Sequence, residues 1–439
     1  MRQGSPRELS DAGSDHRRRL TAAMVETASE HGFLGATVAR VVERAGVSRA
    51  TFYEHFADRA DCFRAAHRER AEAMTARVDA SRAGAPAGGA EAVVDALIAS
   101  LAEDRPGARF LLVGALGSPP SVRREHEELI RRVERSVACF LDEQPPERAI
   151  QIPAAALVAG VADVLARQAL ANGTADLAAA RLAVSRWIDA YRLPPGVRPL
   201  SQDRWRELGR FAREAPATEP AEPQLLPRGR TALPDGAAAR ARRRRILDAT
   251  ARLCRERGYC AVTVAEIAAA ARVPRSAFYA HFSDKKEALM AAQTAGLQSA
   301  MAVAAAEYSP VAPWAERVWK LIRGFLGYLA EAPDYAHLDF VESYAAGSEA
   351  VRHRQQNHAV FALFLEDGYR RQGAEVRLPW ACTEAIAGAV LGLIRKTIVE
   401  GRTERMLSLM PAAGYTVLAP FTGPQEAARK AFSWGRAAR

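Results

Sequence analysis

Residues 20–63 read LTAAMVETASEHGFLGATVARVVERAGVSRATFYEHFADRADCF, and residues 246–289 read ILDATARLCRERGYCAVTVAEIAAAARVPRSAFYAHFSDKKEAL. The two segments align without a gap, with Leu20 opposite Ile246, and 14 of the 44 aligned positions are identical. Only three of these identities are alanine, so a shared alanine-rich composition does not explain the match. The chain therefore contains a duplicated segment, which we call copy 1 (residues 20–63) and copy 2 (residues 246–289).

Each copy predicts a helix followed by two short helices. The first helix carries its apolar residues at the spacing of an amphipathic helix, and it is expected to end at Gly32 in copy 1 and at Gly258 in copy 2. Thr37 and Thr263 then stand where a second helix would need an N-cap. In copy 2 the cap is extended to a capping box by Glu266, whereas copy 1 has arginine at the equivalent position.

A tight turn leads to the third helix of each copy, so the last two helices form a helix-turn-helix. In copy 1 the turn reads AGVS, and in copy 2 Arg272 replaces Gly46 and Pro274 replaces Ser48. Arginine adopts the positive φ of such a turn poorly, whereas proline is acceptable in the first turn of the helix that follows. The third helix of each copy places two aromatic residues, one helical turn apart, toward the core: Phe52 and Phe56 in copy 1, and Phe278 and Phe282 in copy 2. Its outer side carries small, polar and basic residues, which suit a DNA groove. These residues are Arg49, Ala50, Thr51, Tyr53 and His55 in copy 1, and Arg275, Ser276, Ala277, Tyr279 and His281 in copy 2.

This combination of helix, cap, turn, aromatic pair and following D-(R/K) resembles the N-terminal domain of the TetR family of transcriptional regulators, here present twice. The resemblance implies that the third helix enters the major groove, where Arg49, Ala50, Thr51, Arg275, Ser276 and Ala277 would contact base edges. It also implies that Tyr53, His55, Tyr279 and His281 touch the DNA backbone, that Arg59 and Lys285 bind phosphates, and that Thr37 and Thr263 lie at the DNA surface. The long helical segments behind each copy fit the family's ligand-binding and dimerisation domains in length and class.

The chain is therefore predicted to be all-α, with two TetR-like units, each an N-terminal three-helix helix-turn-helix domain followed by a helical ligand-binding and dimerisation domain. The expected division is 14–76 and 77–214 for the two domains of unit 1, 215–238 for a proline-rich linker, and 239–300 and 301–439 for the two domains of unit 2.

Charge is distributed unevenly between the two units. The formal net charge is +10, but residues 1–200 contribute only +1 and the remainder +9. Residues 16–63 sum to +1 and residues 240–289 to +7, and a run of four arginines (Arg242, Arg243, Arg244 and Arg245) precedes copy 2. Such runs at the start of the first helix suggest a basic arm that reaches a groove or phosphates, with a solvated helix end as the alternative.

The regulatory segments differ in aromatic content, with four aromatic residues in 91–200 and sixteen in 291–439. Unit 2 is therefore the better candidate for a pocket that binds a hydrophobic or aromatic effector, although the same rings would also fill a helical core. The candidate pocket residues are Trp314, Phe325, Tyr328, Phe340, Tyr344, Phe361, Phe364 and Trp380. Two helices rich in small residues, 154–171 and 381–400, suggest partner-facing surfaces, with buried alanine-rich helices as the alternative.

Other classes of protein are disfavoured. The motifs GxSxG, GxxxxGK(S/T), HExxH and GxGxxG are absent, so an enzyme is not expected. Five cysteines without a CxxC spacing (Cys62, Cys139, Cys254, Cys260 and Cys382) predict no disulfide framework and no zinc site, and are expected to be buried. No apolar stretch approaches the ~18 residues of a membrane span, and no secretory signal is evident, so a cytoplasmic protein is expected.

These observations predict a sequence-specific DNA-binding transcriptional regulator, a repressor that a small-molecule effector releases. No cofactor or metal is expected. The expected partners are double-stranded operator DNA, the effector, and a second regulatory surface, either within the chain as a pseudo-dimer or in a homodimer. The alternative is a ligand-sensing or scaffold protein in which one or both helix-turn-helix domains no longer bind operator DNA.

Overall fold

The computed structural model describes residues 6–84, 89–145, 149–171, 176–195, 197, 199–203, 205, 236–307, 311–358, 360–371, 378–379 and 381–437. Within these ranges the chain folds into helices joined by short connections, and the sole extended pairing is an isolated bridge between Ile150 and Arg192. The all-α prediction is confirmed. Among the same residues, no helix combines the length and hydropathy that a membrane-spanning segment requires.

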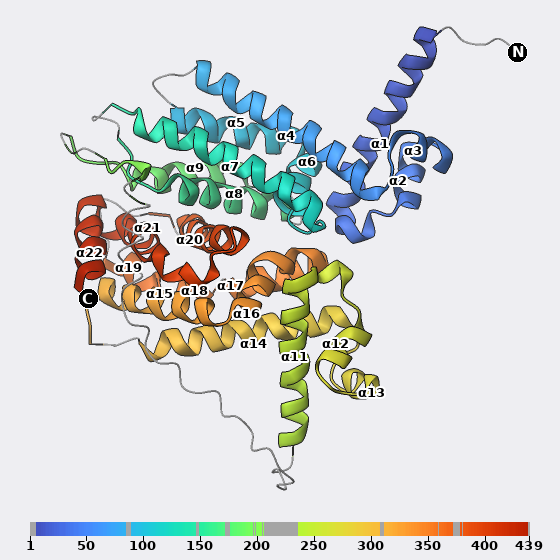
Figure 1. The fold of residues 1–439 in the computed structure, drawn as a ribbon. Coiled ribbons are helices and arrows are strands. Elements are labelled where there is room, and N and C mark those ends of the chain that lie inside the picture. Colours follow the sequence, from blue (N-terminus) through green and yellow to red (C-terminus); the bar gives the residue numbers. More distant parts are fainter. Residues whose placement is uncertain are drawn as a thin grey trace, which may run out of the picture.

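Unit 1 begins with its helix-turn-helix and continues into a helical bundle (Figure 1). Its elements are α1 (Pro6–Gly35), α2 (Val38–Ala45), α3 (Arg49–His55), α4 (Arg59–Gly84), α5 (Gly89–Glu103), α6 (Arg105–Arg109), the π-helical turn η1 (Phe110–Gly114), α7 (Pro120–Asp142), α8 (Ala154–Leu170) and α9 (Leu177–Asp189). Gly32 has a non-helical φ of 68°, so α1 is interrupted where the first helix was expected to end.

Unit 2 repeats this order after the linker. Its elements are α11 (Ala237–Arg257), η4 (Tyr259–Ala261), α12 (Val264–Ala270), α13 (Arg275–Tyr279), α14 (Lys285–Ala306), α15 (Trp314–Glu331), α16 (Pro333–His337), the π-helical turn η5 (Leu338–Glu342), η6 (Ser343–Ala346), α17 (Ser348–His358), α18 (Val360–Leu363), α19 (Glu366–Arg371), α20 (Cys382–Val399), η7 (Thr403–Leu409), α21 (Met410–Thr422) and α22 (Pro424–Ala437).

The duplication extends beyond the two copies into the regulatory segments. The elements α6, η1 and the start of α8 recur at one constant spacing as α16, η5 and the start of α20, so that Ala154 corresponds to Cys382. This spacing is slightly larger than that between the two copies, because unit 2 has two more residues than unit 1 between the start of its fourth helix and this region. Even the π-helical turn is preserved, so the two units share their regulatory fold as well as their helix-turn-helix.

The expected domain boundaries fall within continuous helices. The boundary at 76/77 lies inside α4, and the boundary at 300/301 lies inside α14. Each of these helices therefore joins a helix-turn-helix to its regulatory bundle without a loop between them. Of the expected linker, residues 215–235 lie outside the described residues, so its division from the two units stays a proposal.

Helices α8 and α20 pack against each other and join the two units. Glycines allow the two helices to approach: a Cβ atom added at Gly160 would lie 2.7 Å from the carbonyl oxygen of Ala385, and one added at Gly392 would overlap Ala159. Gly160 and Gly388 occupy equivalent positions in the two units, and Gly388 in turn lies against unit 1. The prediction that the small-residue helices 154–171 and 381–400 face a partner is confirmed, and that partner is the other unit of the same chain.

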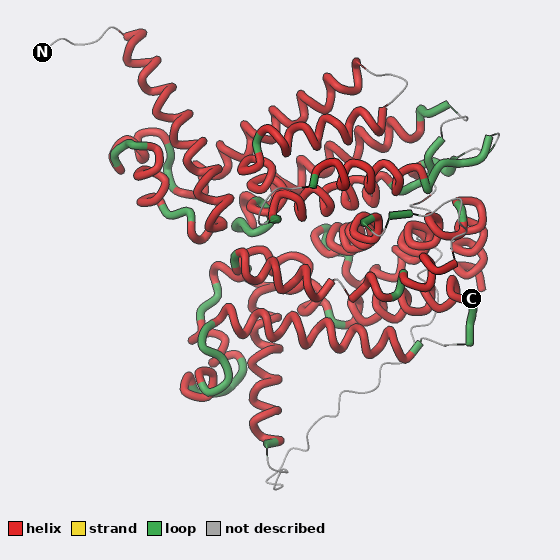
Figure 2. Tube along the Cα trace, turned by 180° about the vertical axis from the view of Figure 1, so that it is seen from behind, coloured by secondary structure: helices red, strands yellow, loops and turns green. Residues whose placement is uncertain are grey.

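The regulatory segments of both units share one hydrophobic core, whereas each helix-turn-helix has its own. The Tyr191 hydroxyl of unit 1 accepts a 3.0 Å hydrogen bond from Trp187 Nε1 and donates one of 2.7 Å to the carbonyl oxygen of Thr416 in unit 2. Copies 1 and 2 lie at the same end of the molecule, beside this joint core, in both views (Figures 1 and 2).

Candidate DNA-binding interface

Local hydrogen bonds hold the helix-turn-helix of copy 1. The Thr37 hydroxyl accepts from the Arg40 amide at the start of α2, and the Ser48 hydroxyl accepts from the Thr51 amide at 3.0 Å at the start of α3. Between the two helices Gly46 takes a left-handed conformation with φ of 63°. Arg19 of α1 donates to the carbonyl oxygens of Ala45 and Gly46, so the first helix secures the turn.

Copy 2 reaches the same turn with different residues. The predicted capping box is present: the Thr263 amide donates to Glu266 Oε2 at 2.9 Å, and the Glu266 amide donates back to the Thr263 hydroxyl. Arg272 has φ of 54° and is the only non-glycine residue in the described chain with positive φ. The turn geometry is therefore retained despite the arginine, at a cost of about 1 kcal/mol relative to glycine.

The third helices bury one face and expose the other, as predicted. Phe52 and Phe278 are fully buried, while Tyr53 and Tyr279 are 58% and 50% exposed. The remaining predicted groove residues follow the same pattern in both copies: Arg49, Ala50, Arg275 and Ser276 are exposed, and Thr51, His55, Ala277 and His281 are half-buried. Both copies therefore present the same set of small, polar and basic groups.

Arg59 and Lys285 are occupied inside their own domains. The Arg59 guanidinium donates to the carbonyl oxygen of Leu34 at 3.1 Å and lies 4.3 Å from the ring centroid of Phe33. Lys285 Nζ donates to the carbonyl oxygens of Tyr259 and Val262 at 3.0 and 2.9 Å and lies 4.4 Å from the ring centroid of Tyr259. In this conformation each cation fixes the connection between the first and second helices, a role that the sequence did not predict.

The arginines that precede the two copies lie within α1 and α11, at the start of the first helix of each unit as expected, and their contact with DNA stays a prediction. Arg242–Arg245 follow the first turn of α11, so consecutive side chains point about 100° apart around the helix. Arg244 lies over the ring of Tyr335 and pairs with Asp248 at 2.9 Å, and Arg243 lies over the ring of Phe282, while all four arginines remain exposed. In unit 1, Arg17 of α1 lies over Phe56 and donates to the carbonyl oxygen of His55 at 3.3 Å.

The aromatic residues proposed for an effector pocket divide into two groups. Phe325, Phe361 and Phe364 line an apolar cavity of about 50 Å³ together with residues of α20 and α21, and the rings of Phe325 and Phe361 meet edge to face at 5.0 Å. Trp314 is close to this cavity, since its Nε1 donates to the carbonyl oxygen of Phe364 at 3.2 Å. These four residues are brought together by the fold.

Three of the other four proposed residues do not join that cavity. Phe340 is fully buried in the joint core, and Tyr328 packs against that core without lining the cavity. Tyr344 faces unit 1, because a Cβ atom at Gly117 would overlap its backbone. Trp380 lies outside the described residues. Richness in aromatic residues identified the correct bundle, but it could not distinguish cavity lining from core and interface.

Cysteines were expected to be buried, and three of the five are. Cys62, Cys254 and Cys382 are buried, Cys260 is half-buried, and Cys139 is exposed, which corrects the expectation for the last two. Burial raises the pKa of the Cys254 thiol to about 12, so the thiol is protonated at neutral pH. In the described residues no group of three or more potential metal ligands is gathered.

Charged contacts between the units were not anticipated from the sequence. On α7 of unit 1, Glu127 pairs with Arg395 and Glu134 pairs with Lys396, both on α20 of unit 2. The members of each pair are far apart in the chain, and nothing in the local pattern of α7 distinguishes these glutamates from solvent-exposed charges. Glu127 and Glu134 can be recognised as interface residues only once α7 and α20 are known to be neighbours.

Comparison with known proteins identifies the repeated segment. Residues 20–66 and 246–292 each match the family model described as bacterial regulatory proteins, tetR family. No curated protein matches the chain in sequence.

Solved structures that match part of this chain include the fatty acid degradation regulator FadR from Bacillus halodurans, with 16% identity over 40% of this chain and 97% of that chain and a TM-score of 0.35. FadR from Bacillus subtilis, solved in complex with stearoyl-CoA, has 16% identity over 41% of this chain and 98% of that chain, with a TM-score of 0.35. The TetR family regulator PfmR from Thermus thermophilus has 22% identity over 41% and 95%, with a TM-score of 0.32. The two family matches fall on the two helix-turn-helix segments described above, so the chain carries two segments of the type found in the tetR family of bacterial regulatory proteins, arranged in tandem.

Proposed function

We propose that this transcriptional regulator is a repressor that acts as an intramolecular pseudo-dimer and leaves its operator when a small hydrophobic molecule binds. The observation that carries the proposal is the presence of two matched, exposed third helices at one end of a chain whose regulatory segments share a single core. A pair of helix-turn-helix domains must present its recognition helices about 34–36 Å apart to read two half-sites on one face of DNA.

The two third helices would read different half-sites. Arg49, Ala50 and Thr51 of copy 1 correspond to Arg275, Ser276 and Ala277 of copy 2. Side chains at these positions meet base edges in the proposed complex, while Tyr53, His55, Tyr279 and His281 meet the backbone. Since the base-contacting sets differ, the operator would be an imperfect palindrome.

Effector release would proceed through α14 and α15 of unit 2. Helix α15 supplies Phe325 to the apolar cavity and packs closely on α14. A Cβ atom added at Gly324 of α15 would lie only 2.9 Å from the Cα atom of Ala304 of α14. Helix α14 continues to Lys285, whose ammonium fixes copy 2. A ligand that enlarges the cavity displaces α15, and α14 carries that displacement to copy 2. Release requires that the ligand bind the displaced arrangement more tightly.

Charge complementarity favours pairing within the chain over pairing between like units of two chains. Arg395 and Lys396 of unit 2 meet Glu127 and Glu134 of unit 1, whereas the positions of unit 2 equivalent to these glutamates hold Gln355 and Ala362, which carry no charge. If unit 2 of one chain paired with unit 2 of another chain, Arg395 and Lys396 would lie at the interface without these carboxylates. An unpaired cation at a half-buried interface costs several kcal/mol.

Two measurements test the proposal. Light scattering of the full chain is expected to give a mass near 47.5 kDa, and a stable mass of twice that value would contradict the pseudo-dimer. A protection footprint on the DNA that flanks the gene is expected to show one asymmetric site. Two matched pairs of variants then assign a half-site to each copy: Arg49→Ala with Arg275→Ala, and Tyr53→Phe with Tyr279→Phe. Each arginine change is expected to relax the sequence preference in its own half-site only.

The alternative is a ligand-sensing protein in which copy 1 no longer binds operator DNA. The low charge of copy 1 favours it, since residues 16–63 sum to +1 against +7 for residues 240–289. If Arg49→Ala and Tyr53→Phe leave operator affinity and its salt dependence unchanged while their copy 2 counterparts lower both, DNA binding belongs to copy 2 alone.

A further inference from the structure

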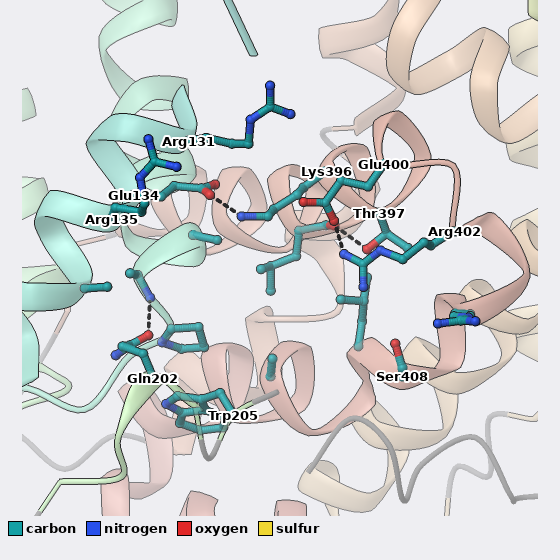
Figure 3. A pocket seen from close by; sticks show the side chains of 18 residues that line it. Arg131, Glu134, Arg135, Gln202, Trp205, Lys396, Thr397, Glu400, Arg402 and Ser408 are labelled. Carbon is teal, nitrogen blue, oxygen red and sulfur yellow. Dashed lines mark hydrogen bonds and ion pairs between the residues drawn. The ribbon is translucent and has the colours of Figure 1, made fainter. Parts of the chain in front are cut away.

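A cavity of about 570 Å³ lies where the two units meet, away from the apolar cavity inside unit 2. This volume falls in the range of small-molecule sites. We call it the inter-unit cleft; Figure 3 shows the side chains that line it, which come from α7, the start of α8 and the segment after α9 in unit 1, and from α20, η7 and α21 in unit 2. Its polar lining consists of Arg131, Glu134, Arg135, Gln202, Lys396, Thr397, Glu400, Arg402, Arg405 and Ser408.

Cations outnumber carboxylates in the lining by five to two. Both carboxylates are already engaged: Glu134 pairs with Lys396, and Glu400 pairs with Arg402, as Figure 3 shows. A ligand that enters the cleft therefore meets carboxylates whose charge is neutralised. The excess of positive charge comes from the three remaining arginines.

These three arginines, Arg131, Arg135 and Arg405, pair with carboxylates that lie outside the lining. Arg131 and Arg135 share Glu128 at 2.8 and 3.4 Å, and Arg405 lies 3.5 Å from Glu404. Their side chains are 44%, 67% and 49% exposed. Exposed pairs of this kind contribute about 0–1 kcal/mol, so an anion can replace them at little cost. Guanidinium groups also bind carboxylate, phosphate and sulfonate groups through paired N–H donors.

The wall of the cleft beside these cations is apolar. Trp205 of unit 1 packs on Tyr415 of unit 2 with ring centroids 4.9 Å apart, which fixes the indole across the interface. Leu393, Leu409 and the side chains of Ala138, Ala154, Ala155 and Ala412 complete this wall. The cleft thus combines an apolar wall with the neighbouring guanidinium groups of Arg131 and Arg135 on α7 and with that of Arg405 on η7.

We propose that the inter-unit cleft is a binding site for an amphipathic anion, a molecule with a carboxylate, phosphate or sulfonate group attached to an apolar, planar body. The anionic group binds Arg131 and Arg135, which lie one turn apart on α7, and the body lies against Trp205. Because Leu393, Leu409 and Ala412 of unit 2 line the same cleft, the bound molecule bridges the two units. This site is separate from the apolar cavity of unit 2 that the proposed function assigns to the effector, and its test uses no DNA, so it stands or falls separately from operator binding.

The test compares two fluorescent probes of similar shape on the full chain. The anionic probe is 8-anilinonaphthalene-1-sulfonate, and the neutral probe is N-phenyl-1-naphthylamine. The anionic probe is expected to bind with a stoichiometry of one per chain and to accept excitation energy from Trp205, a signal that Trp205→Phe reduces. In the double variant Arg131→Gln/Arg135→Gln its Kd is expected to rise roughly tenfold or more, while binding of the neutral probe is unchanged.

Two further variants keep the result interpretable. Arg370→Gln, which removes a 68%-exposed arginine on α19 outside the cleft, is the matched control and should leave both probes unaffected. Ala387→Leu narrows the apolar cavity of unit 2 and should weaken only the neutral probe. The proposal is overturned if the double variant binds the anionic probe as the wild type does, or if Ala387→Leu abolishes binding of the anionic probe, because the sulfonate would then lie elsewhere.

Discussion

Nη2 of Arg123 in unit 1 donates a 2.8 Å hydrogen bond to Oε1 of Glu342 in unit 2, and both side chains are nearly buried, at 10% and 2% exposed. The second oxygen of Glu342 accepts a hydrogen bond from the backbone amide of Tyr259 at 2.7 Å, at the point within copy 2 where α11 leads into η4. A single carboxylate thus connects the regulatory segment of unit 1 to the helix-turn-helix of unit 2. Gly114 stands at the equivalent position in unit 1, at the end of η1, so the link exists on one side of the pseudo-dimer only.

Glu342→Gln is expected to lower the free energy of unfolding by about 3 kcal/mol, because it leaves the Arg123 guanidinium buried without its counter-charge. Burial opposes ionisation of Glu342, but hydrogen bonding from His337, the charge of Arg123 and the Tyr259 amide together hold its pKa below the ordinary value. Since the folded pKa is lowered, this stabilisation is present above about pH 4.5 and is lost as the pH falls through the folded pKa. Urea unfolding at pH 7 measures the effect.

The matched control for Glu342→Gln is Glu366→Gln, which breaks an exposed pair with Arg370 and should cost no more than about 0.5 kcal/mol. The variant Arg123→Met/Glu342→Gln is expected to recover part of the loss. Hydrogen exchange adds a local readout: the Tyr259 amide should exchange faster in Glu342→Gln, and the equivalent Phe33 amide should not change. Equal losses of stability in Glu342→Gln and Glu366→Gln would contradict the coupling.

Gly392→Leu is expected to separate the two units, because even a Cβ atom at this position overlaps Ala159 of α8. Overpacking of this kind costs about 1–3 kcal/mol, and here the strain can be relieved only by moving α20 away from α8. Small-angle scattering should report a larger radius of gyration. Gly327→Ala on α15 is the control, since no atom lies within 4 Å of the added Cβ; a compact Gly392→Leu protein would show that the interface tolerates bulk.

Arg272→Gly is expected to stabilise the chain by about 1 kcal/mol by relieving the left-handed strain at φ of 54°. The opposite exchange, Gly46→Arg, should destabilise copy 1 by a similar or larger amount, because a Cβ atom there also lies 2.8 Å from Nη2 of Arg19. Thermal unfolding of both variants checks the pair. A lower melting temperature for Arg272→Gly would mean that the arginine side chain contributes more than its backbone costs.

The histidines of unit 1 should make stability depend on pH. His67 Nε2 and His126 Nδ1 are 3.2 Å apart and buried, and burial lowers the pKa of His67 to about 4 and that of His126 well below its ordinary value. In the unfolded chain both titrate near pH 6.5, so acidification below that value favours unfolding by up to about 2 kcal/mol per histidine at pH 5.

Urea unfolding at pH 7.5 and pH 5 measures this loss. The double variant His67→Leu/His126→Leu should abolish most of it, while His31→Gln, a change at an exposed histidine, should leave the difference between the two pH values as in the wild type. If the double variant loses as much stability on acidification as the wild type, the pH dependence originates elsewhere.

Features that depend on neighbouring residues were predictable from the sequence, and features that depend on the meeting of distant segments were not. The caps at Thr37 and Thr263, the end of α11 at Gly258 and the buried Phe52 and Phe278 all follow from patterns within a few residues. The strained turn at Arg272 was recognisable because copy 1 supplies a glycine for comparison.

By contrast, the roles of Glu342 and Tyr344 follow from contacts with unit 1, which is distant in the chain, and no periodicity distinguishes such residues from ordinary core. A helical regulatory domain behind each copy was predicted, but the position-by-position correspondence of the two regulatory segments was not visible in the sequence. Their element order repeats at a constant spacing, but their side chains have diverged with the different roles of the two sides, as Glu342 and Gly114 illustrate. Fold is retained there by helix length and position rather than by residue identity.

The packing of α8 on α20 within one polypeptide makes the association of the two units a first-order process. Separate subunits dissociate when they are diluted, so a dimer of separate chains loses its paired form at low copy number. Here ribosomal synthesis delivers the two non-identical partners in a strict one-to-one ratio, and the fraction of assembled protein is the same for one molecule per cell as for a thousand.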